Sequence, residues 1–208
     1  KDGKKLSKSS KNYTDPMELM KKYGTDAFRL YLFRSNAIVM NDLYFDENGI
    51  KSQVQQVLLP LYNCAKFFNS YAVLDNFEPD ENKIPKPTNE LDKWILAKLY
   101  DSEKQVEKCM EDYQIDRYVE PIIDLLDGFS NWYIRRSRRR FWSTEKSKDK
   151  QDAYETTFYV LVSLCKLLAP ITPVVSEKLY KHFTGNESVH LANVPNIPEE
   201  FKNEKNLK

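Results

Sequence analysis

Hydrophobic positions recur with a helical period along most of the chain after residue 49. Pro60 is expected to kink the first of these helices, because proline cannot donate a backbone hydrogen bond. A shorter helix is expected to begin at Thr172-Pro173 and to end at Gly185. The fold class is therefore mainly α, with a helical bundle as its main body. The four long predicted helices span residues 50–73, 90–113, 116–142 and 152–168.

Each long helix has one stripe that is expected to be buried. The stripes of the four helices are Val54, Val57, Leu58, Leu61, Ala65 and Phe68; Leu91, Trp94, Ile95, Leu99, Val106 and Met110; Val119, Ile122, Ile123, Leu126 and Tyr133; Phe158, Leu161, Val162, Cys165 and Leu168.

The segment before the bundle has a different pattern, with short helices and a possible strand. Asp15 and Pro16 form a helix start that runs to Gly24, and a second helix is predicted over 26–35 with Phe28, Tyr31 and Leu32 facing inward. Residues 43–45 are expected to form a short strand. This part is therefore predicted to be a small α/β connecting unit.

Four regions follow from these patterns. We predict a mobile Lys/Ser-rich loop at 1–14, the connecting unit at 15–49, the helical bundle at 50–193 and a frayed tail at 194–208. The chain begins without methionine and without a targeting peptide, so we expect a piece of a longer protein.

Composition narrows the function classes. Hydrophobic residues make up 41%, charged residues 30%, and the net charge is +1, as in soluble globular proteins. No apolar run reaches the length of a membrane helix, and we expect a cytoplasmic protein. Cys64, Cys109 and Cys165 are far apart, and His182 and His190 have no acidic or Cys partner at ligand spacing. We therefore expect no disulfide framework and no metal site.

Two clusters of basic residues stand out against this balanced charge. The first is Lys5-Leu6-Ser7-Lys8-Ser9, in which two ammonium groups lie three residues apart beside hydroxyls. A cationic loop of this kind can close on a triphosphate and stabilise charge that develops in a transition state. A solvated Lys/Ser run is the competing interpretation.

The second cluster is the arginine-rich end of the predicted 116–142 helix. On a helical wheel, Trp132, Arg135, Arg138, Arg139 and Trp142 lie opposite the buried stripe. Guanidinium groups pair with phosphates and indoles stack on bases, a combination suited to single-stranded loop RNA. The alternative is that the tryptophans pack on another helix and the arginines pair with acids.

Arg136 and Arg140 flank this outward-facing set of arginines and tryptophans. Arg140 lies at the edge of the core, and a structural ion pair is expected for it. Arg136 is included in the predicted RNA-binding set together with the outward-facing arginines and tryptophans.

Residues 5–9 (KLSKS) resemble the KMSKS signature of class I aminoacyl-tRNA synthetases, with Leu6 in place of Met. The order of further matching segments extends the resemblance over about residues 1–195, and within the class it is greatest to the isoleucine-specific enzymes of the eukaryotic cytosolic type. Ser9 stands where these often have Arg. The matching segments are NYTDP (12–16), KYGTDAFR (22–29), VLLPLYN (57–63), LDKWIL (91–96), SNWYIRR (130–136), LAPITP (168–173) and SVHL (188–191).

The resemblance implies a function for the whole protein of which this would be a part. Such an enzyme activates isoleucine with ATP and Mg²⁺ and transfers it to tRNA(Ile). It implies that Lys5 and Lys8 are catalytic, that Ser7 and Ser9 help them bind ATP, and that the bundle binds the anticodon arm.

The family's other catalytic motif, HxGH, and its editing domain do not occur in this sequence. The chain alone is therefore expected to be inactive. Two alternatives stay open: a fragment of the valine-specific enzyme, and a non-catalytic helical RNA-binding module.

Overall fold

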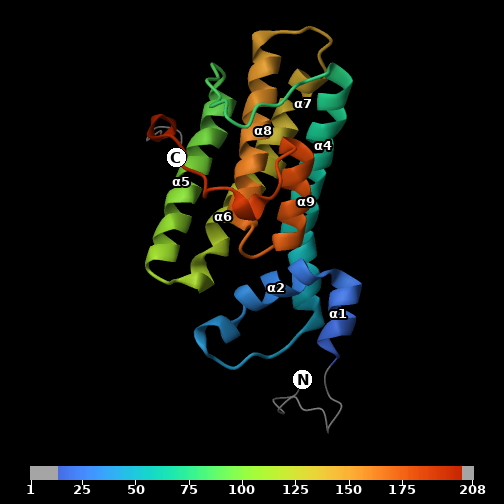
Figure 1. Ribbon diagram of the computed structural model, residues 1–208, viewed down its shortest axis with the longest axis vertical. Helices are drawn as coiled ribbons and strands as arrows, with labels where there is room; N and C mark the ends of the chain where they lie inside the picture. Colours follow the sequence, from blue (N-terminus) through green and yellow to red (C-terminus); the bar gives the residue numbers. More distant parts are fainter. Residues whose placement is uncertain (1–13, 203–208) are drawn as a thin grey trace.

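The computed structural model describes residues 14–202, and every regular element in that range is a helix (Figure 1). The predicted mainly-α fold is confirmed. Long helices run side by side to form the bundle, with a smaller helical unit at one end. The bundle helices are α4 (Leu59–Asp75), α5 (Glu90–Glu111), α6 (Val119–Asp127), α7 (Arg135–Trp142), α8 (Lys148–Leu168) and α9 (Pro173–Thr184).

The N-terminal unit consists of α1 (Pro16–Tyr23), α2 (Thr25–Phe33), the 3₁₀ turn η1 (Asn36–Val39) and α3 (Glu47–Gln53). The start of α1 is as predicted: the Asp15 carboxylate accepts a hydrogen bond from the backbone N–H of Met17 at 2.8 Å.

The prediction of a short strand at 43–45 is wrong, and the described part of the connecting unit contains helices but no strand. Residues 43–45 form no regular element in the structure, and a lone strand would leave its backbone groups unpaired. Phe45 instead packs its ring against Tyr31, with 5.7 Å between the ring centroids.

Two π-helical segments interrupt the predicted long helices. The segment η2 (Val54–Leu58) ends two residues before Pro60, the residue that was expected to kink this helix because proline lacks the N–H donor. The segment η4 (Gly128–Ile134) divides the predicted 116–142 helix into α6 and α7. Such bulges are frequent at functional sites, and this one carries Trp132.

The core lies between α4, α5, α6 and α8, and α9 covers α8. Phe68 of α4 is central: its ring meets those of Phe77, Phe158 and Phe183 at centroid distances of 5.6–6.1 Å. Most residues of the four stripes predicted to face the core are buried or half-buried. Met110 is an exception at 51% exposed, because it lies in the last turn of α5.

Two predicted boundaries need correction. Helix α8 begins at Lys148 instead of residue 152, because the Ser147 hydroxyl accepts a hydrogen bond from the backbone N–H of Lys150 and caps it. Residues 194–202 are not frayed. Ile197 is buried, and the Phe201 ring lies 6.1 Å from that of Tyr159 on α8.

Two side chains of α2 join the N-terminal unit to the bundle. The Asp26 carboxylate accepts hydrogen bonds from the backbone N–H groups of Val174 and Val175 at the start of α9. Arg29 donates to the carbonyl oxygens of Pro170 and Ile171 at 2.8 Å. These bonds pair backbone N–H groups at the start of α9 and carbonyl oxygens just before it, which have no partner within the helix. They therefore fix α2 against the bundle.

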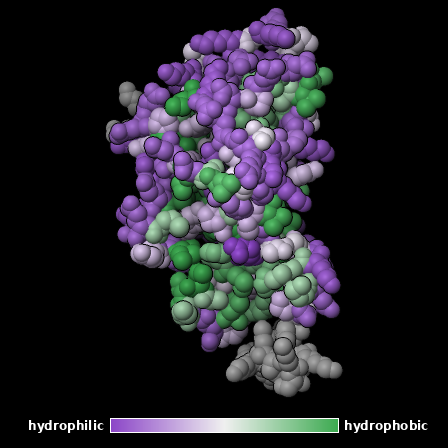
Figure 2. All heavy atoms as spheres, viewed as in Figure 1, coloured by the Kyte–Doolittle hydropathy of each residue, from purple (hydrophilic) through white to green (hydrophobic). Residues whose placement is uncertain are grey.

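The surface differs between the two parts. On the face shown in Figure 2, hydrophilic residues cover most of the bundle, whereas hydrophobic residues gather lower down, toward the N-terminal unit. Val39, Met40 and Tyr44 are among the exposed apolar side chains of that unit. Within residues 14–202, no helix combines the length and the apolar character that crossing a membrane requires.

Candidate nucleic-acid interface

The predicted RNA-binding residues lie together on one outward face of η4 and α7. Trp132 and Trp142 are 48% and 57% exposed, whereas Ser137 and Phe141 on the opposite side are buried. The helical wheel is therefore confirmed for the exposure of these residues. We call this surface the arginine–tryptophan face; it comprises Trp132, Arg135, Arg136, Arg138, Arg139 and Trp142.

The arginines of this face are not used to hold the fold. Within residues 14–202, none of Arg135, Arg136, Arg138 and Arg139 forms an ion pair with an acid or a side-chain hydrogen bond. Four guanidinium groups on two helical turns raise the local positive potential, although the chain's net charge is only +1.

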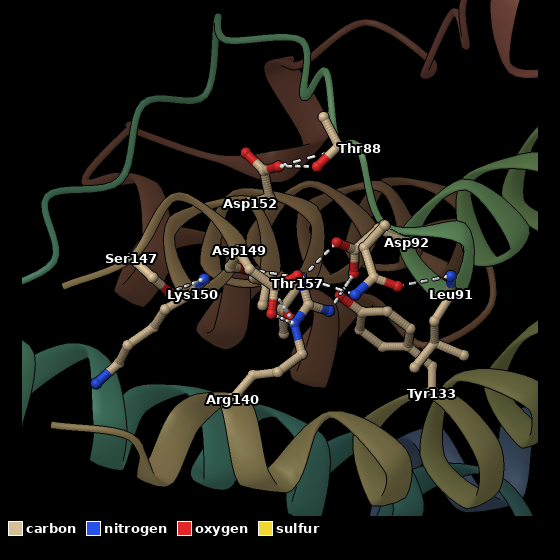
Figure 3. A network of polar contacts seen from close by, with 12 residues as sticks. Thr88, Leu91, Asp92, Tyr133, Arg140, Ser147, Asp149, Lys150, Asp152 and Thr157 are labelled. Atoms are coloured by element: carbon tan, nitrogen blue, oxygen red, sulfur yellow. Dashed lines mark hydrogen bonds and ion pairs between the residues drawn. The ribbon is translucent and has the colours of Figure 1, made fainter. Parts of the chain in front are cut away.

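Arg140 contrasts with its neighbours, and the structural ion pair expected for it is confirmed (Figure 3). Its guanidinium donates two hydrogen bonds of 2.6 Å to the carboxylate of Asp92, whose side chain is 0% exposed. It also donates to Asp149 at 2.8 Å, and the Tyr133 hydroxyl donates to Asp92 at 2.7 Å. The buried acid therefore has three charge-assisted bonds.

The surroundings raise the pKa of Arg140 and that of Tyr133, the two side chains that donate to Asp92. Burial disfavours the charged form of Arg140, but the hydrogen bonds and the charge of Asp92 outweigh this and raise its pKa. Burial and Asp92 raise the pKa of Tyr133 well above its ordinary value. Arg140 therefore stays charged and Tyr133 stays a hydrogen-bond donor.

This network determines which way α7 faces. Arg140 points inward between α5 and the start of α8 (Figure 3), and Ser137 and Phe141 point to the core. Because these residues set the rotation of the helix, the intervening arginines must point outward.

Trp132 has a partner that the sequence interpretation did not include. The guanidinium carbon of Arg136 lies 3.8 Å from the Trp132 ring centroid, so one face of the indole is already stacked. The i, i+4 spacing of the two residues is the signal that points to this pair. A base can therefore stack on the open indole face or on the outer plane of the guanidinium.

Two of the cysteines are buried thiols, and one of the histidines has a hydrogen-bond partner in the bundle. Burial raises the pKa of Cys64 to about 11 and that of Cys165 to about 12, which keeps both as inert thiols. His182 Nε2 lies 2.8 Å from Asn69 Oδ1 on α4. Among residues 14–202, no group of three His, Cys, Asp or Glu side chains could hold a metal ion.

The predicted ATP-binding and catalytic residues Lys5, Ser7, Lys8 and Ser9 lie outside the described residues. Their role stays a prediction from the sequence.

Comparison with protein families gives two matches. Residues 92–208 match the anticodon-binding domain of tRNA ligase, and residues 1–46 match the class I tRNA synthetases for I, L, M and V. The first match contains the entire arginine–tryptophan face, and the second contains the KLSKS segment.

Similar proteins agree with these matches. An isoleucine–tRNA ligase of Protochlamydia amoebophila is 42% identical over 98% of this chain, and one of Chlamydia pneumoniae is 41% identical over 94%. The chain spans only about a fifth of their length, 20% and 19%. These relatives are bacterial, so the eukaryotic cytosolic type stays a prediction.

One solved structure shows the same fold. It is the ternary complex of the Agrobacterium radiobacter K84 LeuRS with tRNA and LeuAMS, with a TM-score of 0.67 at 22% identity over 97% of this chain and 23% of that chain. The family match covers more than half of the residues, and the chain therefore belongs to the anticodon-binding domain family of class I tRNA ligases.

Proposed function

We propose that this chain is the part of an isoleucine–tRNA ligase that binds the anticodon arm of tRNA(Ile), together with the KMSKS-like loop. The observation that carries the RNA-binding role is the arginine–tryptophan face: four exposed arginines that have no acidic partner within residues 14–202, beside two exposed indoles. Guanidinium groups bind phosphates and stack on bases, and unpaired loop bases stack on indoles. The relatives' names support isoleucine over valine.

The catalytic contribution would come from residues 1–14 in a longer, cytoplasmic protein. There the protein would use ATP and Mg²⁺ to activate isoleucine and then transfer it to tRNA(Ile). Lys8, with Lys5, would stabilise negative charge on the phosphates as isoleucine attacks, and Ser7 and Ser9 would help hold the loop on ATP.

We expect the arginines to contribute through phosphate contacts. Arg135→Ala and Arg139→Ala should each reduce the slope of log K against log salt by about 0.7–0.9, because each lost phosphate contact retains counterions on the RNA. The measurement is binding of a tRNA(Ile) transcript at several salt concentrations. Arg117→Ala, which removes an exposed arginine outside this face, should leave the slope unchanged. Unchanged slopes for both face variants would contradict the proposed interface.

Trp132 is expected to contribute by stacking instead of charge. Trp132→Ala should weaken binding of the same transcript by about 1–3 kcal/mol with nearly the same salt slope, because a base loses its stacking partner but no phosphate contact is removed. Thermal unfolding should be close to that of the unmodified chain, since the indole is half exposed. An unchanged Kd would remove Trp132 from the interface.

A further inference from the structure

Helix α2 belongs to two cores at once. Ala27 and Tyr31 pack in the small core of the N-terminal unit, whereas Leu30 packs in the core of the bundle. The helix lies across the end of the bundle (Figure 1). Because both cores share this one helix, its side chains determine how the N-terminal unit is placed on the bundle.

Asp26 of α2 caps a helix of the bundle. Asp26 is 3% exposed, and its carboxylate accepts hydrogen bonds from the backbone N–H groups of Val175 at 2.6 Å and Val174 at 3.4 Å. Thr172, the residue before α9, makes no side-chain capping bond of its own. A negative charge at a helix start is stabilised by the unpaired N–H groups and by the helix dipole. Asp26 therefore supplies the cap that α9 lacks locally.

Arg29 holds the turn that precedes α9. Its Nε donates to the carbonyl oxygen of Ile171 and its Nη2 to that of Pro170, both at 2.8 Å. A guanidinium can make two such bonds at once because its donors lie in one rigid plane. Asp26 and Arg29 are three residues apart on α2, so they hold the two halves of the same α8–α9 connection. We call the hydrogen bonds of Asp26 and Arg29 to this connection the α2 joint.

A second attachment keeps the N-terminal unit from turning about this joint. Arg34, directly after α2, donates from Nε to the carboxylate of Glu120 on α6 at 2.9 Å. Its Nη1 donates to the side-chain oxygens of Gln53 and Gln56 at 2.9 and 3.1 Å. The two ends of α2 are therefore attached to different parts of the bundle, which fixes the orientation of the unit as well as its distance.

The α2 joint lies between the two parts of the proposed function. The KLSKS segment precedes α1 in the sequence, and the chain from Ser9 to Pro16 spans at most about 25 Å when fully extended. Helix α7, which carries most of the arginine–tryptophan face, packs against α8. Helix α8 has 21 residues and is therefore about 30 Å long, and it leads to the turn that Arg29 holds. A shift at the α2 joint would therefore move the start of α1 relative to RNA bound on the face.

We propose that Asp26 and Arg29 are positioning residues: the α2 joint places a tRNA bound on the arginine–tryptophan face so that its 3′ end reaches the activated isoleucine. In this transfer a ribose hydroxyl of the tRNA attacks the isoleucyl carbonyl carbon. The bond from that carbon to the phosphate oxygen breaks, AMP leaves with the electron pair, and the hydroxyl proton is released.

The joint acts on transfer because only transfer needs both parts of the protein in register. Activation consumes ATP and isoleucine alone, so it does not depend on where the tRNA end lies. Binding of tRNA depends on the face itself, which the α2 joint does not touch. The inference rests on the proposed function.

The test measures three quantities in a full-length ligase that carries this segment: isoleucine activation by ATP–pyrophosphate exchange, the Kd of tRNA(Ile), and the single-turnover rate of transfer to saturating tRNA. Arg29→Met removes both donors but keeps an unbranched side chain beside Phe33, and Asp26→Ala removes the cap of α9. Each should slow transfer by about tenfold to a hundredfold, because a misplacement of about 1 Å at the reacting atoms has an effect of this size. Activation and the Kd should each change by less than about twofold.

Conservative variants and a matched control separate positioning from a general loss of structure. Arg29→Lys keeps the charge but donates from a single nitrogen, so it cannot reproduce both planar bonds. Asp26→Asn keeps one oxygen that can accept from the start of α9. Both should recover part of the transfer rate. Lys21→Met removes an exposed cation from α1 of the same unit and should leave all three quantities unchanged. Thermal unfolding of each variant checks that the fold is intact.

The outcomes distinguish this inference from the proposed function. If Arg29→Met and Asp26→Ala transfer at the unmodified rate, or if activation falls by the same factor as transfer, the positioning role is overturned and the proposed function stands. A weaker Kd with unchanged transfer at saturating tRNA also overturns it, because the two residues would then act in binding. If the unmodified ligase neither binds nor charges tRNA(Ile), the proposed function itself fails.

Discussion

Arg140→Ala is expected to lower the free energy of unfolding by about 3–5 kcal/mol, because it leaves a fully buried carboxylate without its charged partner. Asp92 is 0% exposed and would retain only the hydroxyl of Tyr133 as a side-chain donor. Urea or thermal unfolding measures this change. A loss below about 1 kcal/mol would show that water or another cation compensates Asp92, contrary to the expectation.

The adjacent arginine supplies the matched control. Arg139→Ala removes the same side chain one position earlier in the same helix, but from an exposed site without an acidic partner in the described chain. Its effect on stability should stay within about 0.5 kcal/mol. The two variants should therefore distinguish Arg140, which stabilises the fold, from Arg139, which contributes little to stability.

Lys8→Ala, made in a full-length ligase that carries this segment, is expected to slow formation of the aminoacyl-adenylate by an activation free energy of about 2–4 kcal/mol. The reason is that a lysine on the phosphates acts mostly as charge develops, so isoleucine affinity should change little. Pre-steady-state kinetics measures the two quantities separately.

Lys11→Ala is the control for that experiment. Lys11 lies in the same basic stretch but outside the KLSKS segment, so its removal should leave the activation rate nearly unchanged. Equal rates for the Lys8→Ala variant and the unmodified enzyme would remove Lys8 from the mechanism.

The outward direction of the arginines was predicted well because a helix relates sequence to space by a fixed rotation. Once Tyr133 and Ser137 are assigned to the core, the wheel places Arg135 and Arg139 outside, and the structure agrees. The wheel does not account for the π-helical turn that carries Trp132, nor for the stacking of Arg136 on its ring. These depend on local hydrogen bonding and on rotamers.

Other features were not accessible from periodicity. The strand expected at 43–45 did not form, because strand formation needs a partner strand and the local pattern of three apolar residues cannot supply one. The ion pair of 2.6 Å between Asp75 at the end of α4 and Lys150 in the first turn of α8 joins residues that are far apart in sequence. Only the packing of α4 against α8 brings them together.

The sequence by itself determined the helical class, the outward direction of the arginines and the resemblance that the family matches confirmed. Each of these depends on local order: a repeat of 3.6 residues, or a run of motif residues. The tertiary structure alone decided that Arg140 pairs with Asp92, which lies 48 residues earlier in the chain. It also decided that the neighbouring arginines have no acidic partner in the described chain. Ion pairing depends on which charged side chains come within hydrogen-bond distance of one another, and in this bundle that depends on the packing of distant segments.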